Sequence, residues 1–232
     1  VIAHRNRAPV DDLLQRGAKE ADSLADLAAA CSIVHICAPG SPQVEAIVDA
    51  MLATLVRDSI VIDCSTADPT STMRLAARLE EAGCAMVDAP LGGTPTQAEA
   101  GSLTAKVGCD EAIFERIEPV IGSWAATVKR LGGVGDGHRM KLLNNFLSLG
   151  YAALYSEALA LGNKVGISPT TFDSVMRGSR MECGFYQTFM GYIIEGNREA
   201  HKFTLTNAFK DLRYLESMAD SVNLSNPIGN AV

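Results

Sequence analysis

A lysine and two asparagines interrupt the apolar run at residues 139–148, "RMKLLNNFLS". On a helix, Lys141, Asn145 and Ser148 would fall at positions i, i+4 and i+7, and would therefore share one face. Burial lowers the pKa of a lysine from its ordinary value of about 10.4. Such a lysine can act as a general acid and base, while a neighbouring amide orients the substrate oxygen that exchanges the proton.

A second interpretation needs no chemistry. Lys141 would then lie near the start of the helix and extend its ammonium group into solvent. Asn144 and Asn145 would tie the helix to a neighbouring loop, since buried polar groups need partners. The residues of this run leave both interpretations open.

Small and hydroxylated residues follow three predicted strands, which are the segments "SIVHICAP", "SIVIDCST" and "CAMVDAP". The residues that come after them are Ala38-Pro39-Gly40, Ser65-Thr66 and the segment 89–94. In open α/β sheets, ligands bind outside the carboxyl ends of the strands. Ordinary turn chemistry explains any one of these loops, but three in succession favour a cleft lined by backbone groups.

The two parts of the chain have different patterns. Apolar strands alternate with amphipathic helices up to the segment "GGVGDG" at 132–137, and no strand pattern follows it. The first part predicts a mainly parallel sheet covered on both faces. A long helix from His138 to about Gly166 then leads into an all-α part. The predicted domains are residues 1–134 and 135–232.

Composition excludes several classes of protein. The net charge of −7 argues against a general nucleic-acid binder, whose surface would be basic. Every apolar stretch is interrupted before the roughly 18 residues that a membrane span needs, and the start of the sequence is too polar for a signal peptide. The six cysteines form no CxxC pair and no cluster with the four histidines. We expect buried, reduced thiols in a cytoplasmic protein, without a metal site.

Three segments, taken in order, resemble the β-hydroxyacid dehydrogenase family. They are "DAPLGGTPTQAEAGSLTAKVG", "GVGDGHRMKLLNN" and "FKDL". The family pattern GxGxxxK(x)xNN ends here at Lys141 and Asn144-Asn145. The resemblance covers essentially the whole chain. It implies a Rossmann-type dinucleotide-binding domain, a long interdomain helix and an all-α domain. It also implies NAD(P)-dependent interconversion of a small 3-hydroxy acid and its semialdehyde, in a homodimer or homotetramer.

The resemblance also implies roles for individual residues. Lys141 matches the catalytic lysine of the family, and Asn145 matches the residue that assists it. The other matched positions are Gly92, Gly93, Thr94, Asn144 and Ser148 for the substrate, and Arg5, Ala38, Pro39, Thr66 and Lys210 for the cofactor.

The sequence departs from the family in two places. The family opens with a strand and a GxGxxG loop, whereas this sequence starts near the end of the second strand and stops before the last helices. We therefore expect a protein that is longer in both directions. The family loop Ser-Gly-Gly is Gly92-Gly93 followed by Thr94 here, so one hydroxyl donor is lost. Backbone amides and Thr94 remain to hold the acid group of the substrate.

The choice of cofactor depends on "His4-Arg5-Asn6", which aligns with the end of the second strand. An acidic residue there would bind the ribose 2′-hydroxyl of NAD, and none is present. Arg5 could instead pair with the 2′-phosphate of NADP. NADP is favoured and NAD stays an alternative, as does an Arg5 that only stacks on the adenine.

Two other functions compete with this interpretation. A 6-phosphogluconate-type dehydrogenase would pair the lysine with His-Asn, where this chain has Asn144-Asn145, and would need a basic cluster for a sugar phosphate. A non-catalytic reader or scaffold could keep the dehydrogenase fold without its chemistry. The presence of Lys141, Asn145 and Lys210 argues against a scaffold.

Overall fold

The computed structural model describes residues 6–232 of the chain. Contacts divide the chain into two compact units, which are Val1–Gly93 with Gln97–Met140, and Thr94–Thr96 with Lys141–Val232. The division falls a few residues after the predicted domain boundary, inside one long helix.

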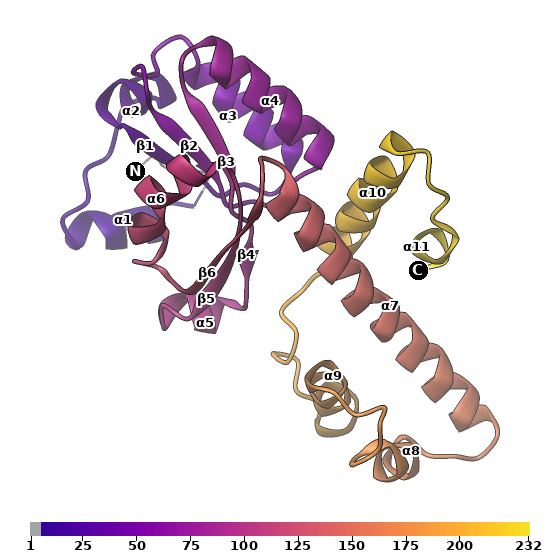
Figure 1. Ribbon diagram of the computed structural model, residues 1–232. Coiled ribbons are helices and arrows are strands. Elements are labelled where there is room, and N and C mark those ends of the chain that lie inside the picture. Colours follow the sequence, from indigo (N-terminus) through magenta and orange to yellow (C-terminus); the bar gives the residue numbers. More distant parts are fainter. Residues whose placement is uncertain (1–5) are drawn as a thin grey trace. The chain divides into compact units, whose positions relative to one another are not determined.

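The described part of the first unit holds a six-stranded sheet (Figure 1). Its strands are β1 (Ile33–Ile36), β2 (Ile60–Asp63), β3 (Ala85–Asp88), β4 (Leu91–Gly92), β5 (Leu103–Gly108) and β6 (Ala125–Gly132). The order is β1-β2-β3-β5-β4, and β6 pairs with β5. Strands β1 to β3 are parallel to one another, and so are β5 and β6, whereas β5 runs antiparallel to β3 and β4. The two-residue strand β4 was not predicted, because it is too short to show an alternating pattern.

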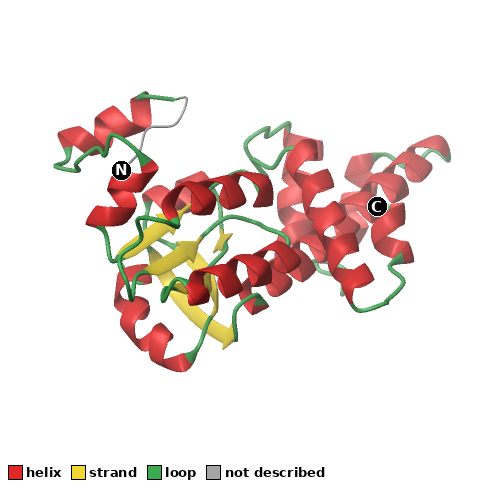
Figure 2. Ribbon diagram, turned by 90° about the horizontal axis from the view of Figure 1, so that it is seen from above, coloured by secondary structure: helices red, strands yellow, loops and turns green. Residues whose placement is uncertain are grey.

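Helices flank the strands on both sides (Figure 2). Those that precede residue 136 are α1 (Ala8–Gln15), α2 (Leu24–Ala30), α3 (Ser41–Met51), α4 (Pro69–Glu81), α5 (Pro95–Glu99) and α6 (Glu111–Ile121). Ser23 caps α2 by accepting a bond from the Asp26 amide, and Asp68 caps α4 by accepting one from the Thr70 amide.

The segment "SPQVEAIVDAM" predicts Ser41 as the cap of α3, and this prediction is wrong by one residue. Gly40 precedes the helix in an extended conformation, and Ser41 is the first helical residue. The Ser41 hydroxyl is engaged elsewhere, because it accepts a bond of 2.7 Å from the Asp68 amide. This bond connects the starts of α3 and α4, which follow β1 and β2.

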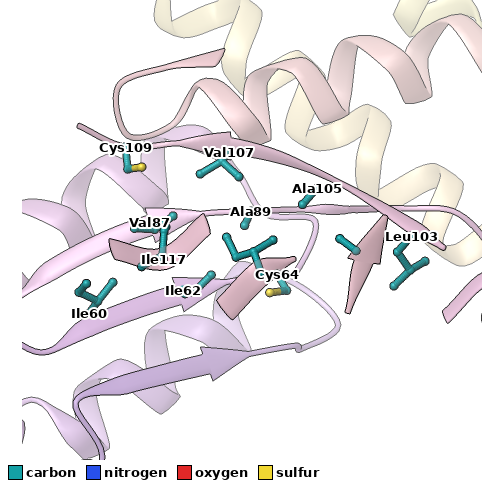
Figure 3. Close-up of a cluster of buried hydrophobic side chains, with 12 residues drawn as sticks. Ile60, Ile62, Cys64, Val87, Ala89, Leu103, Ala105, Val107, Cys109 and Ile117 are labelled. Atoms are coloured by element: carbon teal, nitrogen blue, oxygen red, sulfur yellow. The ribbon is translucent and has the colours of Figure 1, made fainter. Parts of the chain in front are cut away.

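Both faces of the sheet are buried, which explains why its strands are apolar at successive positions. Ile60 and Ile62 of β2 belong to a core that contains residues of β3, β5 and α6 (Figure 3). Val61, which lies between them, packs on the opposite face against α2, α3 and α4. Full burial of one such side chain contributes about 1.5–3 kcal/mol to stability.

The second unit is helical. Its elements are α7 (Asp136–Lys164, which begins in the first unit), α8 (Pro169–Met176), α9 (Gly184–Glu195), α10 (Leu205–Ser221) and α11 (Pro227–Ala231). Leu159 of α7 packs with Tyr186, Phe189 and Met190 of α9. The buried Tyr186 hydroxyl donates to Asp173 Oδ1 at 3.0 Å, which joins α9 to α8. The predicted long helix is confirmed, with a start two residues earlier than expected.

Large apolar side chains lie exposed on this unit. On α7, Leu147, Leu154 and Leu161 are each more than half exposed and are spaced seven residues apart. That spacing places them along one stripe of the helix. Leu205 and Phe209 of α10 are exposed as well. None of the helices described is long and apolar enough to cross a membrane.

All six cysteines are free thiols. Cys64, Cys84 and Cys109 are buried, as expected for thiols in or beside strands. Cys37 and Cys183 are exposed. The expectation of buried thiols is wrong for these two, because they lie in the loop after β1 and immediately before α9.

Candidate active site

Helix α7 carries the predicted polar face. The helix is continuous through residues 136–164, so the side chains of Lys141, Asn145 and Ser148 project from the same face of it. Asn145 is buried, whereas Lys141 and Ser148 are half-buried. Asn144 is exposed, and its carbonyl accepts a bond of 3.1 Å from the Ser148 hydroxyl. Lys141 is therefore partly accessible to solvent, and it is not buried in the core.

Asp211 of α10 connects two of the predicted residues. Its Oδ2 accepts a bond of 2.6 Å from Asn145 Nδ2, and its Oδ1 lies 3.0 Å from Lys210 Nζ. The Lys210 ammonium group also lies 5.1 Å from the centre of the Tyr214 ring, which suits a cation–π contact. Because Asp211 is 3% exposed, this ion pair and hydrogen bond are protected from solvent, and they fix the Asn145 amide.

Asp211 was not predicted from the sequence, although a signal for it was present. The buried positions of α10 are Ala208, Asp211, Leu215 and Ala219, which recur at helical spacing. A carboxylate on the apolar face of an amphipathic helix needs a partner. That requirement singles out the aspartate in "FKDL" as well as the lysine.

We expect the Asp211→Ala variant to lower the free energy of unfolding by about 1–3 kcal/mol, because it leaves the buried Asn145 amide without its acceptor. Chemical denaturation followed by circular dichroism measures the change. Asp220→Ala is the matched control, since Asp220 is an exposed aspartate of the same helix and should change stability by less than about 0.5 kcal/mol. Equal losses in the two variants would contradict the role given to Asp211.

In the first unit, Asp88 holds the start of α7. Its Oδ1 accepts a bond of 2.6 Å from the Gly135 amide, and its Oδ2 accepts one of 2.7 Å from the His138 amide. The side chain is fully buried. Burial raises the pKa of Asp88, while His138 and the two amides oppose that rise. A carboxylate at the N-terminus of a helix is also favoured by the helix dipole.

His138 joins the same helix to the loop after β2. Its Nδ1 lies 2.8 Å from the Thr72 hydroxyl, and its Nε2 lies 3.1 Å from the Ser65 carbonyl. Since the carbonyl can only accept, Nε2 donates to it, while the Thr72 hydroxyl also donates to the Asp68 carbonyl at 3.1 Å. The Ser65 hydroxyl in turn accepts a bond of 2.8 Å from the Ala38 amide. A chain of hydrogen bonds thus links the loops after β1 and β2 to the first turn of α7.

The predicted cofactor loops are held by these bonds. Ala38 and Thr66 are half-buried and Pro39 is exposed, so small side chains and one hydroxyl border the strand ends. These groups fit a dinucleotide, whose ribose and amide groups need backbone and hydroxyl partners at close range. Arg5, the residue predicted to decide between NADP and NAD, lies outside the described residues.

The predicted substrate loop begins in β4. Gly93 has a φ of +130°, which favours glycine. A side chain at Gly92 would overlap the Thr104 hydroxyl, and its Cβ would lie 3.3 Å from Lys106 Nζ. Space around Gly92 therefore explains why a serine, expected there from the family pattern, is absent. Thr94, which follows, is half-buried.

The second unit contains a cavity of about 680 Å³ among α7, α10 and α11. Its walls are mainly apolar and include Leu149, Ala153 and Phe209. Neither Lys141 nor Asn145 lines it. Across residues 6–232, no group of three or more His, Cys, Asp or Glu side chains is placed to hold a metal ion.

Two family models together match nearly the whole chain. Residues 1–133 match the NAD binding domain of 6-phosphogluconate dehydrogenase. Residues 135–232 match the NAD-binding domain of NADP-dependent 3-hydroxyisobutyrate dehydrogenase. The 2-(hydroxymethyl)glutarate dehydrogenase of Eubacterium barkeri is 31% identical over 208 residues, which are 88% of this chain and 69% of that enzyme. The chain belongs to the β-hydroxyacid dehydrogenase family.

Other members of the β-hydroxyacid dehydrogenase family are similarly related. The 3-hydroxyisobutyrate dehydrogenase of Pseudomonas aeruginosa is 30% identical over 94% of this chain and 76% of its own length. The solved structure of Psf3 in complex with NADP+ and 2-OPP superimposes with a TM-score of 0.80 at 27% identity, and covers 99% of this chain and 82% of that one. The expected fold, a Rossmann-type domain followed by an all-α region, is confirmed. A nicotinamide dinucleotide is the cofactor that both family models indicate.

Proposed function

We propose that the protein is an NAD(P)-dependent oxidoreductase that interconverts a small 3-hydroxy acid and its semialdehyde. The observation that carries the proposal is the polar face of α7. There, Lys141 is half-buried and Asn145 is fixed by Asp211, in a chain whose relatives are named as dehydrogenases of small hydroxy acids.

Lys141 is the acid and base of the proposed reaction. Its ammonium group donates a proton to the carbonyl oxygen during reduction, and its amine accepts one during oxidation. One N–H of the Asn145 amide is bonded to Asp211, so the other is available to hold the same oxygen. The residues that would hold the dinucleotide are Arg5, Ala38, Pro39, Thr66 and Lys210, and the bound dinucleotide would supply or take up the hydride.

The remaining predicted residues position the substrate. The amides of Gly92, Gly93 and Thr94 bind the acidic group of the substrate, while Asn144 and Ser148 border it. Fixing both ends of a small molecule brings the carbonyl to its proton donor in one orientation, which is the main contribution of such groups to rate.

A panel of small semialdehydes tests the proposed function. The purified protein is mixed with NADPH or NADH, and oxidation of the reduced cofactor is followed by absorbance. We expect turnover with at least one acidic semialdehyde. Reduction of NADP+ or NAD+ by 6-phosphogluconate, without turnover of any semialdehyde, would support the rival dehydrogenase, and cofactor binding without turnover of any substrate would support the scaffold.

We also propose NADP as the preferred cofactor, on the basis of Arg5 in the sequence. The Arg5→Ala variant should raise KM for NADPH by about 10–100-fold, since a hydrogen bond to a charged group contributes about 1.5–3 kcal/mol. KM for NADH should change little. The comparison of the two cofactors in steady-state kinetics measures the effect, and an equal rise for both would show that Arg5 only stacks on the adenine.

The proposal includes a cytoplasmic location and assembly into a homodimer or homotetramer. The stripe of exposed leucines on α7 supports an assembled state, because large exposed apolar patches mark interaction surfaces.

A further inference from the structure

We propose that Lys106 is a specificity-determining residue, whose ammonium group binds the acidic group of the substrate beside Gly92. The inference rests on the proposed function and names a side chain that the family pattern does not assign. It would supply the attraction that the missing serine hydroxyl no longer provides. The substrates concerned are semialdehydes whose distal group is an oxyanion.

The alternation of β5 places Lys106 away from the core. Leu103, Ala105 and Val107 are buried in the core of the sheet, so the intervening Thr104 and Lys106 project from the opposite face. Both are half-buried. Lys106 is therefore held on a partly covered surface and does not extend freely into solvent.

The same face of β5 meets the predicted substrate loop. β4 pairs with β5, with Gly92 opposite Thr104. The Thr104 hydroxyl donates to the Gly92 carbonyl at 3.4 Å. The Lys106 ammonium group lies 3.3 Å from the point that a Cβ at residue 92 would occupy. The volume of the absent serine side chain is thus bordered by a hydroxyl and by a cation.

The electrostatics of this face favour an anion. Lys106 lies in register with Lys129 on the neighbouring strand β6, and like charges on adjacent strands repel. Within residues 6–232, neither lysine forms an ion pair. Asp88, which pairs with Gly108 of β5, already accepts two amide bonds. An acidic ligand would supply the missing negative charge.

The first turn of α7 adds to the positive potential. Gly108, two residues beyond Lys106 on β5, packs against the Gly137 amide. The N-terminus of a helix carries a partial positive charge and favours anions. The face of β5 around Lys106 is therefore bordered by the substrate loop at one end and by a helix N-terminus at the other.

The test measures the Lys106→Met variant with an anionic and a neutral aldehyde of equal chain length, malonic semialdehyde and propanal. We expect kcat/KM for the anionic aldehyde to fall by about 10–100-fold, mainly through KM, because a charged hydrogen bond is lost. The value for propanal should stay within about twofold. Lys106→Arg should retain part of the preference, since it keeps the charge. Lys164→Met, at an exposed lysine of α7, is the matched control and should leave both substrates unchanged.

Three outcomes would decide against the proposal. If the unmodified protein reduces malonic semialdehyde and Lys106→Met behaves like Lys164→Met, the proposal fails while the proposed function stands. An equal loss with both aldehydes would show a structural role for Lys106. If no aldehyde is reduced by the unmodified protein, the proposed function fails and this inference fails with it. Should Lys106→Met not fold, Lys106→Gln carries the same comparison.

Discussion

Replacing Lys141 with alanine is expected to lower kcat by about 10²–10⁴-fold, the range typical for loss of a positioned general acid and base. The reason is that no other ammonium group is predicted to exchange the proton with the substrate oxygen. Affinity for the dinucleotide should stay nearly intact, because the residues assigned to it lie elsewhere in the sequence. Steady-state kinetics gives kcat, and quenching of protein fluorescence by NADPH gives the Kd.

Two further variants separate chemistry from structure. Lys164→Ala removes a lysine from the last turn of the same helix and should leave kcat unchanged. Lys141→Arg keeps the positive charge, but its guanidinium stays protonated near neutral pH, so it should not restore turnover. Ordinary turnover by Lys141→Ala would remove the central residue of the proposed reaction.

The second large expected effect is a change in the free energy of unfolding, and it concerns two glycines of α7. A Cβ at Gly137 would overlap the Lys106 carbonyl oxygen and would lie 2.7 Å from Asp88 Oδ2. The first of these atoms belongs to the backbone of the sheet and has no rotamer through which to move away. We expect Gly137→Ala to lower the free energy of unfolding by about 3 kcal/mol or more, which is the upper end of the usual cost of overpacking. The bonds from Asp88 to the first turn would be disturbed as well.

Gly150, on the same helix, should respond in the opposite direction. No atom lies within 4 Å of a Cβ added there. Alanine is favoured over glycine inside a helix by about 0.5–1 kcal/mol, so Gly150→Ala should stabilise the protein by up to that amount. Chemical denaturation followed by far-ultraviolet circular dichroism compares the two variants. Changes of the same sign would mean that the close approach at Gly137 is tolerated.

Much of the fold could be predicted from the sequence because its signals are local. The apolar strands β1, β2 and β3 follow from short β-branched runs, and α7 follows from a long apolar pattern that ends before Gly166. Strand β4 could not be predicted, since two residues carry no period. The cap of α3 was misplaced because the Ser41 hydroxyl binds the amide of Asp68, a residue 27 positions away.

In the candidate site, too, only features within one element could be predicted from the sequence. Helical spacing predicted that Lys141 and Asn145 share a face, because both belong to one element. Asp211 lies 66 positions from Asn145, and Asp88 lies 50 positions from His138. Partners so far apart are brought together only by the tertiary fold, and one sequence shows no pattern that connects them. The substrate loop was predicted from the resemblance to the family, whereas the neighbouring Lys106 was not predicted.

The close approach at Gly137 has a geometric consequence for the first turn of α7. Because a main-chain oxygen of β5 occupies the space beside this glycine, this turn cannot rotate about the helix axis without a steric clash. A hydrogen atom in place of a side chain therefore fixes the rotational setting of the first turn of α7 against β5.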